Sequence, residues 1–145
     1  MPKYDASIVG FVTLDVLGRS VDTIPEGGGI AYLEEMTMSP AGTLGGAAMN
    51  AAKLGANVLA DCSMGEDEAS DYITNTFKRL GIDTSMIQHH ADTPTSSTIL
   101  PIRSNGDRPC LHCRGASEKL FVQEGDFDAV TDAKILHYAG HGFIG

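Results

Sequence analysis

The sequence predicts an α/β fold with a buried parallel sheet, and three kinds of segment support this prediction. Short apolar runs at residues 6–12, 57–64 and 135–139 are typical of parallel strands that are covered on both faces. Residues 67–81 repeat apolar side chains at helical spacing, with polar side chains between them. Residues 43–55 are rich in alanine and close with a glycine, which favours a second helix.

The composition indicates a single domain with a core, because the chain has 145 residues and 42% of them are hydrophobic. The net charge of −9 argues against nucleic acid or an anionic membrane as the main partner. We expect neither a signal peptide nor a membrane span, because no segment approaches the roughly 20 apolar residues that a membrane helix needs. Three unevenly spaced cysteines fit reduced thiols, so the expected location is the cytoplasm.

Asp15 is the first candidate site residue. The strand expected at residues 6–12 leads into Thr13, Leu14 and Asp15, and ligands of open α/β sheets bind at the carboxyl ends of the strands. The alternative is a turn aspartate whose carboxylate accepts hydrogen bonds from nearby N–H groups.

Two hairpins are expected beside the parallel sheet, at about residues 16–40 and 95–115. The first has a glycine-rich tip and its second strand at residues 30–36. The second turns at Asn105 and Gly106, a pair that strongly favours a hairpin turn. Hairpins inserted into an α/β chain predict a flap beside the sheet.

The helix expected at residues 43–55 has an unusual start, because no strong capping side chain precedes it. Gly45 and Gly46 are therefore expected to leave the first free backbone N–H groups uncovered. Asn50 follows Gly46 by four residues, so its amide projects from the same face of the helix. Such a helix end suits a hydroxyl-rich or anionic small molecule.

The remaining elements are expected to contribute packing. Asp67 can cap the amphipathic helix and Gly81 can end it. A short helix is expected at residues 126–130, and the last apolar strand, residues 135–139, has no helix after it to cover it.

Three groupings compete for the polar residues. A polyol site would join a carboxylate, backbone N–H groups and an amide, from Asp15, Gly45, Gly46 and Asn50, and it contains no nucleophile or general base. A zinc site from Cys110, His112 and Cys113, with His89 and His90 near in sequence, lacks a second spaced pair of ligands. A cysteine nucleophile with His137 or His141 lacks a recognised context. We therefore predict no catalytic and no metal-ligating residue in this chain.

The motifs of the chain resemble the N-terminal half of a ribokinase/PfkB-family carbohydrate kinase. They are Gly10 followed by Asp15, Gly45-Gly46 followed by Asn50 and Leu54-Gly55, Met64-Gly65-Glu66-Asp67, Leu80-Gly81-Ile82-Asp83, Asn105-Gly106-Asp107-Arg108 and Gly115-Ala116. The resemblance implies a ribokinase-like three-layer α/β/α (Rossmann-like) core. Residues 1–145 would be its N-terminal part, with the two hairpins as a small lid at about residues 16–40 and 95–115.

The resemblance also implies roles for the candidate residues. Asp15 and Asn50 would hold substrate hydroxyls, and Gly46, next to Gly45, would give the sugar close access to the backbone. Further candidates for substrate contact are Thr13, Thr98 and Arg103. For Arg103, which could pair with a carboxylate or phosphate, the alternative is a solvated arginine on an edge strand. The hairpins would cover the sugar and could join two copies as a homodimer.

Two departures from the family pattern limit what the resemblance implies. Ala47 stands where ribose-specific members commonly carry lysine, which weakens a ribose assignment. The Gly-Ala-Gly-Asp segment, which supplies the catalytic aspartate and the anion hole, is absent. ATP and Mg²⁺ are the implied cofactors, with a monovalent cation as a further candidate, and their sites belong mostly to the absent half.

The resulting hypothesis is the substrate-binding and lid half of an ATP-dependent kinase, present as an excerpt, a proteolytic fragment or a truncated product. The whole enzyme would transfer the γ-phosphoryl group to a hydroxyl of a sugar, sugar acid or nucleoside. The chain alone is expected to be inactive. The alternative is a non-catalytic carbohydrate-binding or subunit-interaction module.

Overall fold

The computed structural model describes residues 1–120 and 126–142, and a parallel sheet of three strands lies at its centre. This core sheet has the order β4-β1-β9, with β1 at Tyr4–Gly10, β4 at Val58–Asp61 and β9 at Ala133–Ala139. Ile8 of β1 is in register with Ala60 on one side and with His137 on the other. All four residues of β4 are buried, as its continuous apolar sequence predicts.

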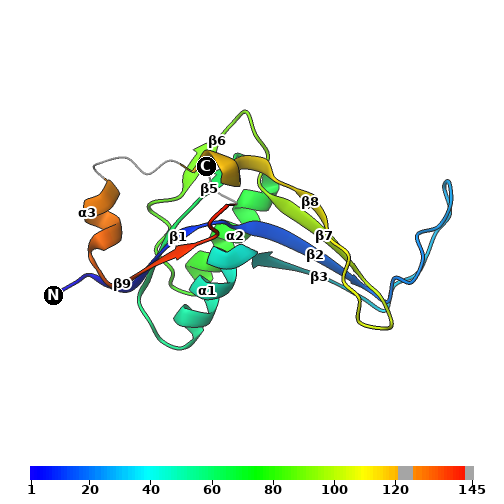
Figure 1. The fold of residues 1–145 in the computed structure, drawn as a ribbon, viewed down its shortest axis with the longest axis horizontal. Helices are drawn as coiled ribbons and strands as arrows, with labels where there is room; N and C mark the ends of the chain where they lie inside the picture. Colours follow the sequence, from blue (N-terminus) through cyan, green and yellow to red (C-terminus); the bar gives the residue numbers. More distant parts are fainter. Residues whose placement is uncertain (121–125, 143–145) are drawn as a thin grey trace.

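Helices cover both faces of the core sheet (Figure 1). On one face, α1 (Gly42–Lys53) and α2 (Glu68–Arg79) bury Leu44 and Phe77 against Ile8. On the other face, α3 (Asp126–Thr131) buries Val130 with Val9. The described residues therefore form the expected three layers, α/β/α. Across these residues, no helix is long and apolar enough to span a membrane.

A second sheet of four strands, here called the outer sheet, projects away from the core sheet (Figure 1). Its order is β3-β2-β7-β8, with β2 at Thr13–Arg19, β3 at Glu35–Ala41, β7 at Ser97–Ile102 and β8 at Leu111–Cys113. The pairs β2–β3 and β7–β8 are antiparallel hairpins, while β2 and β7 are parallel. The two hairpins are therefore joined edge to edge into one continuous surface.

A short connection completes the described fold. The segment expected as one strand at 57–64 is broken at Cys62, because β5 (Ser63–Gly65) leaves the core sheet and pairs with β6 (Gln88–His90). A 3₁₀ helix, η1 (Gly115–Lys119), follows β8.

Three expected boundaries are wrong. β1 ends at Gly10, so Asp15 lies inside the separate strand β2 rather than at the end of the first strand. The second strand of the first hairpin is Glu35–Ala41, later than the expected residues 30–36. Helix α1 begins at Gly42, so Gly45 and Gly46 are its fourth and fifth residues. Their N–H groups lie beyond the first turn and are not the free groups of a bare helix end.

The amphipathic helix is confirmed in detail. Asp67 caps α2 by accepting a hydrogen bond from the Ser70 N–H at 2.9 Å, and the Ser70 hydroxyl completes a capping box. Gly81 follows the helix with φ of 75°, a conformation that glycine adopts without strain. The short helix and the last strand also occur, as α3 and β9.

Candidate substrate-binding site

Three polar residues form a row across one face of the outer sheet. Asp15 of β2 is in register with Thr98 of β7, and Thr98 is in register with His112 of β8. Residues in register across paired strands point to the same face, so these three side chains lie side by side. Thr13, two residues before Asp15, joins them on that face.

Hydroxyl and imidazole groups connect this row. The Thr13 and Thr98 Oγ1 atoms lie 3.2 Å apart, and Thr98 Oγ1 lies 3.0 Å from Nδ1 of His112. The His112 ring also packs edge-on against Phe11, with ring centroids 5.7 Å apart. Phe11 lies in the connection between β1 and β2. Its contact with the imidazole therefore packs the outer sheet against the end of the core sheet.

The Asp15 carboxyl group is the least satisfied polar group of the row. Its Oδ1 is buried and has no hydrogen-bond partner among the described residues. Burial raises the pKa of Asp15, while the Thr98 hydroxyl and the positive charges of Arg108 and His112 oppose that rise. A buried acceptor without a donor is costly, and hydroxyl groups of a ligand would supply the missing donors.

A pocket of about 250 Å³ lies in front of this row. Its lining combines polar and apolar side chains: Phe11, Thr13, Asp15, Gly42, Thr98, Leu100, Arg108, Cys110 and His112. Helix α1 reaches the pocket through its first residue. Gly42 has φ of 76°, and a Cβ there would lie 2.7 Å from the Phe11 oxygen, so both conformation and space require glycine.

The first turn of α1 is fastened by the same phenylalanine. The Leu44 N–H donates a hydrogen bond of 2.9 Å to the Phe11 oxygen, in place of a capping side chain. One of the N–H groups at this helix start is therefore bonded to the backbone and not available to a ligand.

The structure brings together some of the residues that the sequence proposed. Thr13, Asp15 and Thr98 line one pocket. Gly45, Gly46 and Asn50 do not line it, although they belong to α1, whose first residue does. Gly45 is buried against Val12 and Pro40, whereas a Cβ at Gly46 would meet nothing within 4 Å and Asn50 is exposed.

Arg103 lies apart from the pocket lining. It stands at the turn of the second hairpin, where its backbone N–H donates to the Asp107 oxygen at 2.9 Å and its charge helps to lower the pKa of Asp22, after the larger effect of hydrogen bonds from Ser104.

Six lining residues were not predicted from the sequence to bind substrate: Phe11, Gly42, Leu100, Arg108, Cys110 and His112. Cys110 and His112 were weighed only as zinc ligands. The position of His112 could not be counted from the Asn-Gly pair, because a two-residue turn there would have placed Cys113 opposite Thr98. The loop contains three residues, 104–106, and this places His112 opposite Thr98. A signal for Arg108 was present. Arg108 stood in the Asn-Gly-Asp-Arg segment that supported the family resemblance.

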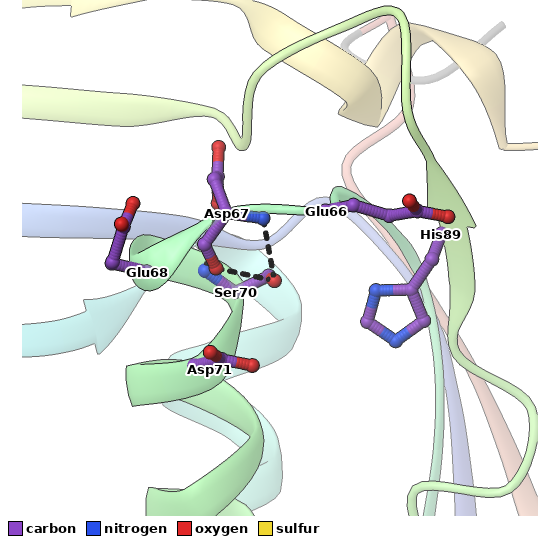
Figure 2. A pocket seen from close by; sticks show the side chains of 6 residues that line it. All are labelled: Glu66, Asp67, Glu68, Ser70, Asp71 and His89. Atoms are coloured by element: carbon purple, nitrogen blue, oxygen red, sulfur yellow. Dashed lines mark hydrogen bonds between the residues drawn. The ribbon is translucent and has the colours of Figure 1, made fainter.

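A second hollow, of about 360 Å³, lies at the start of α2 and is strongly acidic (Figure 2). Its lining residues are Glu66, Asp67, Glu68, Ser70, Asp71 and His89. The Asp67 carboxylate is already satisfied by the N–H groups of Ser70 and Thr95 and by the Thr95 hydroxyl. No three His, Cys, Asp or Glu side chains in residues 1–120 and 126–142 are placed to hold a metal ion. The Asp67 carboxylate in this hollow therefore serves as the cap of α2.

The architecture defines the class of protein. A three-layer α/β/α core with a sheet of two hairpins beside the carboxyl end of β1 is the arrangement that the resemblance to ribokinase-like proteins implied. The chain belongs to the pfkB family of carbohydrate kinases, whose profile matches residues 5–144. This match confirms the family resemblance. No curated protein sequence matches the chain.

Solved structures show the same fold. The chain is similar to a ribokinase from Arabidopsis thaliana, solved with ribose and ATP, with a TM-score of 0.80 and 18% identity over 93% of this chain and 45% of that one. A ribokinase from Giardia lamblia gives a TM-score of 0.77 and 20% identity over 97% and 43%. A fructokinase from Halothermothrix orenii gives 0.74 and 21% over 92% and 45%. The chain thus spans less than half the length of these structures.

Proposed function

We propose that this chain is the substrate-binding and lid half of an ATP-dependent kinase that phosphorylates a hydroxyl of a sugar, a sugar acid or a nucleoside. The observation that supports this proposal is the buried, unpartnered Oδ1 of Asp15, which lines a pocket together with the hydroxyls of Thr13 and Thr98. Asp15 would accept hydrogen bonds from two hydroxyls of the substrate, and the threonines would add donors and acceptors. Gly45, Gly46 and Asn50 would contact the sugar from α1 when the pocket is filled.

The described residues do not fit the cofactors of the whole reaction. No group of three metal-ligating side chains occurs among them, and no glycine-rich phosphate loop with a following lysine lies at a helix start. As the family resemblance implies, ATP and Mg²⁺, with a monovalent cation as a further candidate, would bind mostly to residues outside this chain. We expect the chain alone to bind substrate and to transfer no phosphoryl group.

The outer sheet would act as the lid over the sugar. Its far face carries an apolar row across all four strands, formed by Met38, Val16, Ile99 and Leu111 in register. Three of these four side chains are exposed, and a second copy of the outer sheet would cover them in a homodimer. The cytoplasmic location stays a prediction from the cysteine content.

Calorimetry tests the pocket. The chain is titrated with a panel of neutral sugars, sugar acids and nucleosides, and then with the same panel after Asp15→Asn. Loss of the charged acceptor is expected to weaken binding by roughly tenfold or more, because hydrogen bonds to charged groups contribute about 1.5–3 kcal/mol. Asp22→Asn is the matched control, since Asp22 is an exposed aspartate that binds Ser104 outside the pocket. Unchanged affinity in Asp15→Asn would remove this residue from the site.

Two measurements test the wider proposal. Mass spectrometry of the native product is expected to give about twice the mass of this chain, as the coverage of the solved structures indicates. A native product of this length would favour the non-catalytic binding module. ATP-dependent phosphorylation by the purified chain would contradict its expected inactivity.

A further inference from the structure

Arg108 is a charged side chain of the pocket that the proposed sugar contacts do not use. It lies between β7 and β8, four residues before His112, and it lines the same pocket as Asp15. Two nearby arginines form ion pairs, Arg19 with Glu35 and Arg114 with Glu118 at 2.7 Å, and Arg103 does not line the pocket. Arg108 forms no ion pair with any described residue.

The positive charge of Arg108 nevertheless acts on a carboxyl group inside the pocket. It opposes the rise in the pKa of Asp15 that burial causes, so the guanidinium and the carboxyl group act on each other across the pocket. They do not pair directly. The pocket therefore has an acceptor at Asp15 of β2 and a separate group of donors at Arg108, in the connection between β7 and β8. Thr98 of β7 and His112 of β8 also line it.

We propose that the substrate of this site is a polyhydroxylated carboxylate, a sugar acid, whose hydroxyls bind Asp15 and whose carboxylate binds Arg108. This inference rests on the proposed function and narrows its substrate class. A guanidinium offers two parallel N–H donors that match the two oxygens of one carboxylate. A neutral sugar would fill the Asp15 end and leave the charge of Arg108 without a partner.

The separation of the two groups also explains how an anion is tolerated in a pocket that contains an aspartate. The carboxylate of the substrate would lie at the Arg108 end, away from Asp15. His112, which also opposes the rise in the Asp15 pKa, belongs to β8, the strand that follows Arg108 in the chain. The charges of substrate and pocket would then alternate in sign, which is favourable for binding.

The test compares two ligands that differ at one carbon. D-gluconate and D-glucitol share their chain of hydroxyls, but the first carries a carboxylate where the second carries a hydroxymethyl group. Calorimetry on the chain is expected to show gluconate binding about tenfold or more tightly, as hydrogen bonds to charged groups predict. Arg108→Gln is expected to remove that preference by weakening gluconate and leaving glucitol unchanged.

Controls make the outcome specific to Arg108. Arg79→Gln alters an exposed arginine of α2 outside the pocket and is expected to change neither affinity. Arg103→Gln tests the arginine that the sequence proposed, and loss of the preference there instead of at Arg108 would overturn the inference. Arg108 is exposed, so its variants are expected to unfold at the wild-type temperature.

The remaining outcomes separate this inference from the proposed function. Equal binding of gluconate and glucitol, both weakened by Asp15→Asn, would overturn the sugar-acid inference and retain the polyol site. Tighter binding of D-fructose 6-phosphate than of gluconate, dependent on Arg108, would replace the carboxylate by a phosphate. Binding of no polyhydroxylated compound would overturn both proposals.

Discussion

The core sheet and the outer sheet are both built of short strands, but they differ in how much of a strand is exposed. Every residue of β4 in the core sheet is buried, whereas every residue of β8 in the outer sheet is exposed. Helices cover both faces of the core sheet at β1 and β4, whereas most of β9, at the edge of that sheet, is exposed. The outer sheet keeps a polar row on one face and an apolar row on the other, so its side chains remain available to other molecules.

One aspartate in each sheet has a buried carboxyl oxygen without a hydrogen-bond partner among the described residues. In the outer sheet, the Asp15 carboxyl group is partly buried at the pocket. A ligand bound there would offset the free-energy cost of burying its unpaired oxygen. Asp61 places a carboxyl group in the core sheet with no exposed surface and no hydrogen-bond partner among the described residues. The comparison of the two sheets can therefore be tested by substituting apolar side chains of different exposure and by substituting buried aspartates.

The largest expected effect comes from a pair of leucines. Leu59 of β4 is 1% exposed and Leu111 of β8 is 60% exposed. Leu59→Ala should lower the free energy of unfolding by about 2–5 kcal/mol, because it removes buried methyl groups and leaves a cavity. Leu111→Ala should change it by less than about 0.5 kcal/mol. Urea unfolding of both variants measures the difference, and similar losses would mean that β8 is covered in solution.

The next largest effect is a pH dependence that arises from Asp61. Burial raises the pKa of Asp61 from 3.8 to about 6, and the negative charge of Asp126 on α3 adds to the rise. The folded chain thus keeps the proton over a range in which the unfolded chain has lost it. The contribution of Asp61 to the free energy of unfolding is therefore greatest below about pH 4 and falls by about 3 kcal/mol as the pH rises through about 6.

Asp61→Asn isolates this contribution. Urea unfolding of wild type and variant is measured from pH 4 to pH 7, and the other acidic groups cancel in the difference between the two. The variant should gain on the wild type as the pH rises. A difference that stays constant across this range would show that Asp61 has an ordinary pKa in the folded chain.

A smaller effect is expected where the two sheets are tied together. Asp67 of the α2 cap accepts hydrogen bonds from the Thr95 N–H and hydroxyl, just before β7 begins. Asp67→Ala should cost about 1–2 kcal/mol, as the loss of a helix cap does. Hydrogen exchange should show faster exchange at the start of β7 as well as at the start of α2. Protection lost only in α2 would show that the outer sheet is held independently.

The smallest expected effect on stability is at the apolar row of the outer sheet. Ile99→Ser replaces a side chain that is 57% exposed, so it should change the free energy of unfolding little. It should instead weaken self-association, measured by analytical ultracentrifugation, if two outer sheets meet through this row. Thr37→Ser, at an exposed residue of β3 outside the row, is the control.

Much of the fold could be predicted because its signals are local. The apolar runs of β1, β4 and β9 and the capping box of α2 are contained in short stretches of sequence. The start of α1 could not be predicted, because it has no capping side chain, the usual sign of a helix start in a sequence. Gly42 and a hydrogen bond from the Leu44 N–H to the Phe11 oxygen take its place. The break at Cys62 depends on a partner strand more than 20 residues further along the chain, in β6.

The candidate site shows the same limit. Asp15 was predicted from its place after the first strand and from the family resemblance, and Thr98 from its place in the expected lid; the structure places them in one row. Arg108 and His112 enter the pocket only because β8 pairs with β7, which a residue-by-residue reading does not contain. Arg103 precedes Arg108 by only five residues, but it lies at the turn of the hairpin and does not line the pocket.

The free edge of β9 has a practical consequence for every measurement on this chain. Within the described residues, β9 pairs only with β1, and three of its large apolar side chains, Ile135, Leu136 and Tyr138, are exposed. An apolar strand with an unpaired edge is a template for aggregation between chains. Affinities and unfolding curves should therefore be recorded over a dilution series, so that precipitation or strand-to-strand aggregates are not mistaken for ligand effects.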